Sequence, residues 1–149
     1  MMLEYTHMKL DNRWVTADGT LNELPITIHS REDWEAIAES GRFPICVQIA
    51  WHAVAKDEKN AYPSAKEMQN IEVFHHQLQL QLESDAHTVV AMVITHDGVN
   101  QWVIYTDDIE LVKAGLNNLT APEQGFPIEI VADEDAQWQT FKKVHQAIQ

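Results

Sequence analysis

Residues 88–105, TVVAMVITHDGVNQWVIY, decide the fold of this chain of 149 residues. The segments 88–94 and 101–105 are rich in β-branched and aromatic residues, which favour strands. Between them the segment 96–100 contains Asp97-Gly98, a dipeptide that tolerates the positive φ of a tight hairpin. The stretch therefore predicts two antiparallel strands joined by a turn.

A helix is predicted on each side of this hairpin. The segment Tyr62-Pro63-Ser64 opens the first helix, because proline is tolerated in a first helical turn. The second helix begins at Asp107, with Glu110 three residues later as in a capping box, and continues to about Asn118. The residues that form an apolar stripe on the first helix are Met68, Ile71, Phe74, His75, Leu78 and Leu82.

Two further strands are predicted at 44–51 and 126–131. The order strand, helix, strand, strand, helix, strand favours an α+β fold with a ferredoxin-like βαββαβ core, an antiparallel four-stranded sheet with its helices on one face. This core spans about 44–131 of a single domain, 1–149. The N-terminal extension, 1–43, is expected to hold two extended pieces around Asp18-Gly19 and a short helix at 31–40, and a C-terminal helix is expected at about 135–148.

The charge of the chain excludes anionic partners. Ten basic residues against 23 acidic ones give a net charge of −13, and a potential of that sign repels nucleic-acid phosphates and anionic membranes. Residues 83–135 carry most of it, with Lys113 as their one basic residue. Two interpretations stay open, a solvated surface that keeps the chain soluble and an acidic face that attracts a basic protein.

Cysteine use and the N-terminal sequence indicate the cytoplasm. The lone Cys46 excludes an internal disulfide, and it lies in an apolar strand where a free thiol acts as a small hydrophobe. The first residues lack the basic and apolar regions of a secretory signal, and no segment has the length and apolar character of a membrane span. We therefore expect a cytoplasmic protein with no membrane partner.

Motifs that identify an enzyme class are missing from the sequence. There is no nucleophile elbow, phosphate-binding loop or dinucleotide fingerprint, so no cofactor is predicted and the balance favours a non-enzymatic role. The eight histidines lack the spacing of metal ligands, and a metal site would need distant residues such as His52 and His96. Of the five tryptophans, at least three are expected in the core.

Strand alternation selects the candidate site residues. If Trp51 faces the helices, Gln48 and His52 lie on the open face of the sheet, and Glu129 joins them because it alternates with two isoleucines. Together with Tyr105, these residues are candidates for a ligand pocket. The remaining candidates are Val73 and Leu80, which fall outside the stripe of the long helix and predict a second contact surface.

The aromatic pattern resembles a known bacterial family. Its elements are Trp51 at a strand end, Tyr62-Pro63 before a helix, the run Trp102-Val-Ile-Tyr105, the run 126–130 and the run 135–141. In these positions the chain is similar to the domain of unknown function 695, from about Trp14 to Phe141. That family tends to have an arginine before the hairpin tryptophan, where this chain has Gln101.

The resemblance implies a ferredoxin-like α+β domain in a bacterial cytosol and brings no established activity. Members of the family are in turn similar to domains like the protein inhibitor of ribonuclease E, a fold-level analogy. Together with the acidic charge, this favours a protein-binding or regulatory module for a basic protein. The alternatives are a small-molecule binder or enzyme with its pocket at His52, Tyr105 and Glu129, and a domain that forms homo-oligomers.

Overall fold

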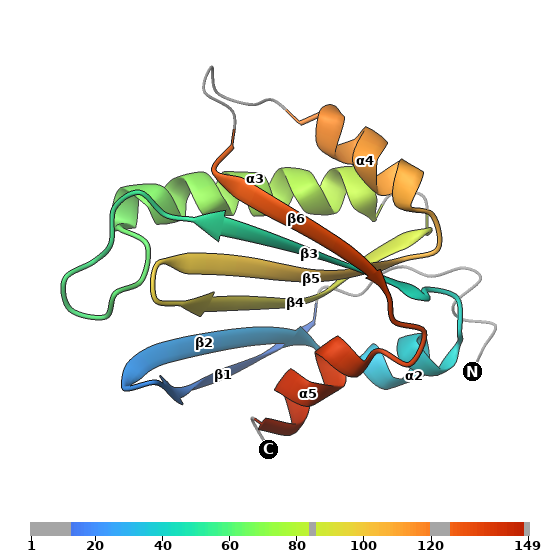
Figure 1. Ribbon diagram of the computed structural model, residues 1–149, viewed down its shortest axis with the longest axis horizontal. Coiled ribbons are helices and arrows are strands. Elements are labelled where there is room, and N and C mark those ends of the chain that lie inside the picture. Colours follow the sequence, from blue (N-terminus) through green and yellow to red (C-terminus); the bar gives the residue numbers. More distant parts are fainter. Residues whose placement is uncertain (1–12, 84–85, 120–125, 148–149) are drawn as a thin grey trace.

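A computed structural model describes residues 13–83, 86–119 and 126–147. Six strands form one sheet in the order β1-β2-β4-β5-β3-β6, with every neighbouring pair antiparallel (Figure 1). The strands are β1 Trp14–Leu21, β2 Leu24–Arg31, β3 Ile45–His52, β4 Thr88–His96, β5 Val99–Thr106 and β6 Ile128–Glu134. The helices are α2 Trp34–Glu39, α3 Ala65–Leu82, α4 Ile109–Asn117 and α5 Gln139–Ala147.

The expected ferredoxin-like, four-stranded core is wrong, because β1 and β2 extend the sheet. Strand β2 pairs with β4 from Ile26 opposite His96 to Ser30 opposite Met92. The backbone N–H and C=O groups of β2 thereby form hydrogen bonds with the edge of β4, which a four-stranded sheet would leave unpaired. The turn between β1 and β2 also differs from the prediction at Asp18-Gly19. It lies at Asn22 and Glu23, both with positive φ, as a two-residue hairpin turn requires.

Helices cover both faces of the sheet, which corrects the expectation of helices on one face. Strand β5 shows why, because its successive side chains alternate between two apolar cores. Trp102 and Ile104 belong to the core under α3 and α4. Val103 and Tyr105 belong to the core under α2 and α5. The N-terminal segment and the last helix are therefore parts of the core structure and not additions to it.

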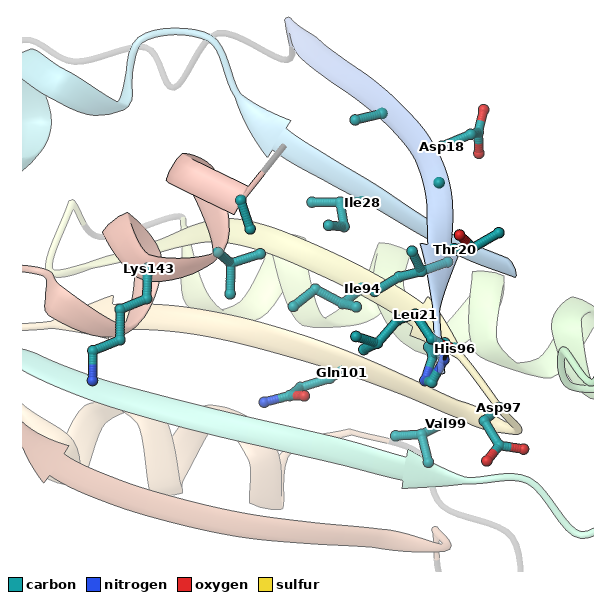
Figure 2. A pocket seen from close by; sticks show the side chains of 15 residues that line it. Asp18, Thr20, Leu21, Ile28, Ile94, His96, Asp97, Val99, Gln101 and Lys143 are labelled. Atoms are coloured by element: carbon teal, nitrogen blue, oxygen red, sulfur yellow. Dashed lines mark hydrogen bonds between the residues drawn. The ribbon is translucent and has the colours of Figure 1, made fainter. Parts of the chain in front are cut away.

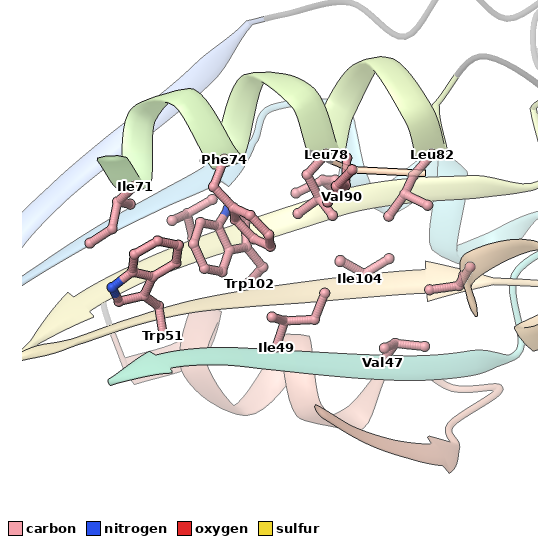
Figure 3. Packing of buried hydrophobic residues seen from close by; sticks show 13 residues of the cluster. Val47, Ile49, Trp51, Ile71, Phe74, Leu78, Leu82, Val90, Trp102 and Ile104 are labelled. Carbon is pink, nitrogen blue, oxygen red and sulfur yellow. The ribbon is translucent and has the colours of Figure 1, made fainter. Parts of the chain in front are cut away.

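The core beneath α3 is built on aromatic rings (Figure 3). Phe74 packs against Trp102 with ring centroids 5.0 Å apart and against Trp51 at 5.5 Å. The predicted apolar stripe is confirmed at Ile71, Phe74, Leu78 and Leu82, all buried. The expectation that at least three tryptophans are buried is also confirmed, by Trp51, Trp102 and Trp138.

The opposite core is closed by Trp138, which precedes α5. Its indole stacks on Tyr105 with centroids 4.0 Å apart, and its Nε1 donates to the carbonyl of Phe43 at 3.0 Å. The helix was expected to open near 135, but β6 runs to Glu134 and the helix begins at Gln139. The connection needs a φ of 57° at Trp138. The spacing of apolar residues in the sequence does not indicate this conformation.

Arg31 is a buried charge that joins β2 to the end of α3. The residue is 1% exposed; its Nε donates to the Val90 carbonyl at 3.0 Å, and its Nη2 lies 3.1 Å from Glu83. Burial raises the pKa of Glu83, while the charge of Arg31 opposes that rise. Because both charges are shielded from water, loss of Arg31 would remove the cation beside Glu83, while loss of Glu83 would leave Arg31 with the more distant Asp33, at 3.6 Å.

Helix α4 approaches α3 closely at Gly115, which predicts the effect of a substitution. A Cβ at this position would lie 2.6 Å from Cδ2 of the buried Leu82. Alanine normally gains about 1 kcal/mol over glycine inside a helix, but here the forced shift of Leu82 should outweigh that gain. We expect Gly115→Ala to lower the free energy of unfolding by about 1 kcal/mol, measured by urea denaturation.

The exposed neighbour Ala114 is the control for helix propensity. Ala114→Gly should destabilise the domain by about 1 kcal/mol through propensity alone. An increase in stability for Gly115→Ala would show that the two helices do not pack tightly at this point.

Candidate functional site

The described surface carries a groove of about 810 Å³ on the face of the sheet that carries α5. It lies over β1, β2, β4 and β5 and is bounded on one side by α5. Figure 2 shows Ile28, Ile94 and Leu21 directed into this space, while Asp18 points away from it. We call this hollow the sheet groove.

The groove exists because α5 is short. The helix has nine residues and is held near its start by Trp138 and Phe141, both buried, so it covers the part of the sheet around Tyr105 and stops there. Beyond it the sheet keeps its apolar side chains, and no helix among the described residues lies above them. The apolar residues that line the sheet groove are Leu21, Ile26, Ile28, Ile94, Val99 and Val144.

Small residues give the groove its depth. Ala17 and Gly19 line it from β1, and Ala147 from α5. A Cβ built on Gly19 would meet only Cγ2 of Ile26, at 3.9 Å, which is an ordinary van der Waals contact. Gly19 has no positive φ, so a larger residue fits its backbone without strain. The absence of a side chain at this position therefore leaves room above the sheet.

Three polar side chains of the groove, those of His96, Gln101 and Asp97, are already engaged. His96 donates from Nε2 to the carbonyl of Leu21 at 2.8 Å, which places a proton on that nitrogen. The amide of Gln101 donates to Oε1 of Gln48 on β3. Asp97 lies 2.9 Å from Lys56, and this hydrogen bond lowers the pKa of the Asp97 carboxyl. The groove thus combines an apolar floor with polar groups that are held in place.

The structure separates the residues predicted for a ligand pocket. Gln48 lies beside the groove through its bond with Gln101. His52 and Glu129 pair at 3.2 Å across β3 and β6, but both side chains are more than half exposed and neither lines the groove. Tyr105 is 0% exposed and contacts no solvent. A shared site of His52, Tyr105 and Glu129 does not form in this structure.

The sequence makes Tyr105 a candidate for a ligand pocket, but residues from a distant part of the chain bury it. Its hydroxyl donates to Asp135 at 2.8 Å and accepts from the N–H of Phe141 at 3.2 Å. Burial raises its pKa far above the usual range, so the phenol stays protonated. Cys46 lies in the same core, where burial raises the pKa of its thiol to about 11. Neither group has the ionisation that a nucleophile at neutral pH requires.

The second predicted surface lies elsewhere on the molecule. Val73 is 57% exposed and Leu80 62% exposed, on the outer side of α3. Helix α3 packs on the face of the sheet opposite to the groove. These two side chains are too few and too far apart along the helix to enclose a ligand. They stay a predicted contact surface separate from the sheet groove.

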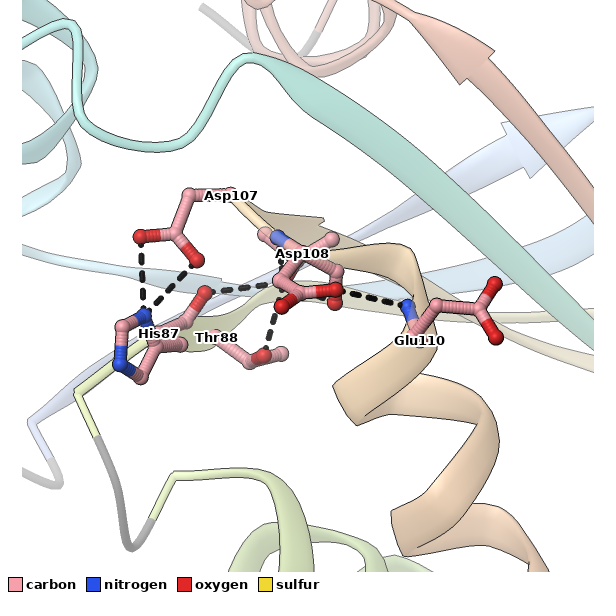
Figure 4. A network of polar contacts seen from close by, with 6 residues as sticks. His87, Thr88, Asp107, Asp108 and Glu110 are labelled. Carbon is pink, nitrogen blue, oxygen red and sulfur yellow. Dashed lines mark hydrogen bonds and ion pairs between the residues drawn. The ribbon is translucent and has the colours of Figure 1, made fainter.

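Other polar clusters have structural explanations. Figure 4 shows His87 beside Asp107, with its Nδ1 2.9 Å from a carboxylate oxygen, next to the start of α4. Asp108 caps that helix by accepting from the N–H of Glu110 at 3.0 Å. Within the described ranges no group of three or more His, Cys, Asp or Glu side chains could hold a metal ion. No described helix is long and apolar enough to cross a membrane.

Comparison with known proteins gives one match. The model of a family of unknown function (DUF695) matches residues 12–144. No curated protein and no solved structure matches the chain. The weaker similarity to ribonuclease E inhibitor-like domains is not shown by these comparisons.

The anchor of α5 predicts a pH effect, because this helix forms one wall of the groove. Burial would raise the pKa of Asp135, but hydrogen bonds from the N–H groups of Thr140 and Gln139 and from Tyr105 lower it overall. A lowered carboxyl pKa stabilises the fold above the unfolded-state value, and this contribution is lost as pH falls below about 4.

We expect Asp135→Asn to reduce the free energy of unfolding by about 1 kcal/mol at pH 7. The difference from the wild type should shrink as pH falls below about 4, in denaturation series at several pH values. Asp133→Asn, an exposed change on β6, should stay within about 0.5 kcal/mol at each pH. A constant difference for Asp135→Asn across the whole range would contradict this role of the charge.

Proposed function

The chain belongs to a family of unknown function, DUF695, and we propose that it is a non-catalytic module whose sheet groove binds an amphipathic helix of a basic protein. The observation that carries this proposal is the uncovered apolar half of a sheet face whose other half is covered by helices. An apolar sheet face is stable when a helix packs on it. The groove therefore lies where a covering helix would be expected.

The dimensions of the groove support a helix as the occupant. It lies over four neighbouring strands, and strands are spaced about 4.8 Å apart, so its floor is about 14 Å wide between the outer strand axes. A helix with its side chains is about 10 Å across. Helix-in-groove recognition needs an apolar floor for the i, i+3, i+4 and i+7 side chains, and the six apolar residues of the groove provide one.

The net charge supports a basic partner. At −13 the domain attracts positively charged molecules over several ångströms, and this raises association rates at low salt. The apolar floor would supply most of the binding energy, and the charge would select helices with lysine or arginine beside their apolar stripe. The lone Cys46, buried in the core, supports the reducing cytosol as the place of action.

The chemistry of the groove supports binding without catalysis. His96 and Gln101 are used in hydrogen bonds with Leu21 and Gln48, which leaves the groove without a histidine poised as a general base. The buried Cys46 and Tyr105 do not line it. The alternative of a small-molecule binder or enzyme at His52, Tyr105 and Glu129 has little support, because His52 and Glu129 pair on the exposed surface while Tyr105 is buried.

Gly19→Phe tests the proposal, because it places a large ring in the groove from an unstrained backbone position. We would select binders to the wild-type domain from a library of displayed random helices. The expected binders have an apolar stripe flanked by Lys or Arg. Gly19→Phe should weaken them at least tenfold, the loss of about 1.4 kcal/mol of binding free energy.

Thr16→Phe is the matched control, since this exposed residue of β1 points to the opposite side of the sheet from Gly19 and does not line the groove. It should leave the affinity of the same binders unchanged. Raising the salt concentration should weaken binding, because salt screens the attraction between the acidic domain and a basic helix. If the selected helices bind both variants equally, or if no helix is selected, the groove is not a helix-binding site.

A further inference from the structure

A second cavity, of about 290 Å³, lies on the other face of the sheet beneath α3. Met68 and Ile71 of the helix and Val93 of β4 form its apolar walls, and the half-buried indole of Trp14 lines it from β1. The volume is close to the lower limit of small-molecule sites. We call this cavity the helix-side pocket.

Asn100 is a buried residue of this pocket whose side-chain donor has no partner among the described protein groups. It is 2% exposed, and its Oδ1 accepts from the hydroxyl of Thr95 at 2.8 Å. Its Nδ2 is buried and has no hydrogen-bond partner within the described part of the chain. A buried donor without a partner costs stability, and a ligand in the pocket can supply the missing acceptor. The amide also keeps an acceptor lone pair on Oδ1 beside that donor.

His75 supplies a second donor in the same pocket. The indole Nε1 of Trp102 can only donate, and it lies 2.9 Å from Nδ1 of His75. The Nδ1 atom is therefore the acceptor, and the neutral ring carries its proton on Nε2. Burial lowers the pKa of His75, which keeps this tautomer neutral at pH 7.

The charges around the pocket restrict the ligand. Of its nine described lining residues none is lysine or arginine, and the one carboxylate is that of Glu72. A phosphate or other anion would be repelled by Glu72 and would find no cation there. Two neutral donors, one neighbouring acceptor and an indole instead suit an uncharged, flat molecule.

We propose that the helix-side pocket binds a small uncharged heterocycle with a lactam group, the carbonyl and ring N–H arrangement found in nucleobases such as uracil and hypoxanthine. The lactam carbonyl accepts from Nδ2 of Asn100, and the lactam N–H donates to Oδ1. The Nε2–H of His75 donates to a second acceptor of the ring, and Trp14 contacts the ring face. This proposal does not depend on the helix-binding role of the sheet groove.

The side-chain amide of Asn100 gives a direct readout. Its two ¹⁵N–¹H signals can be assigned by their disappearance in Asn100→Leu. Titration of the full chain with uracil or hypoxanthine, up to about 5 mM, should shift these signals in a saturable way. 1,3-Dimethyluracil, which has no ring N–H, and uridine monophosphate, which carries a phosphate, should shift them at least tenfold less at equal concentration.

Variants separate binding from folding. Asn100→Leu removes the unpartnered donor but also the acceptor of the Thr95 hydroxyl, so the melting temperature should change little, while the affinity for uracil and hypoxanthine, measured by calorimetry, falls at least tenfold. Trp14→Leu, on the half-buried wall, should also weaken binding. Gly19→Phe lies on the opposite face and should bind the heterocycles as the wild type does, so this proposal and the helix-binding role fail independently.

Three results would overturn the assignment. One is the absence of any shift at Asn100 with every lactam. Another is equal binding of 1,3-dimethyluracil or of the nucleotide. The third is unchanged affinity in a folded Asn100→Leu protein, because binding would then occur elsewhere.

Discussion

Tyr105 packs face to face with Trp138, while its hydroxyl links Asp135 to the first turn of α5. These contacts hold the helix over one end of the sheet, and the helix is too short to reach the other end. Tyr105 and the segment that holds Asp135 and Trp138, 30 residues further along the chain, thus determine where the sheet is covered and where it is open. The sheet groove is the direct result of that boundary, since its apolar floor continues the core beneath α5 without a helix above it.

Local pattern predicts much of this fold. The hairpin at 88–105, the stripe of α3 and the outward positions of Val73 and Leu80 follow from periods of two and 3.6 residues. The N-terminal strands were expected only as extended pieces, because pairing between β2 and β4 depends on backbone hydrogen bonds that leave no mark in side-chain sequence. The same limit applies to the cover over Tyr105, since alternation gives the face of a strand residue but not what packs on that face.

The candidate sites illustrate this difference in another way. Gln48, His52 and Glu129 were assigned correctly to one face by alternation, yet their distances from the groove depend on the ends of α5. Gly19 and Asn100 were missed because both residue types are common beside turns, where sequence gives them a local role. Only the three-dimensional neighbours show that one leaves space above the sheet and the other is a buried amide with an unpaired donor.

The groove and the helix-side pocket share strands β1, β2, β4 and β5. Neighbouring residues line opposite sites, with Asn100 on one side and Gln101 on the other, and Thr95 and His96 related in the same way. The two hollows are therefore separated by a single layer of backbone. Because adjacent positions serve different faces, one amino-acid replacement alters the chemistry of one side and leaves the other side intact. A domain of this size can thus change two separate hollows independently, without gene duplication or a second domain.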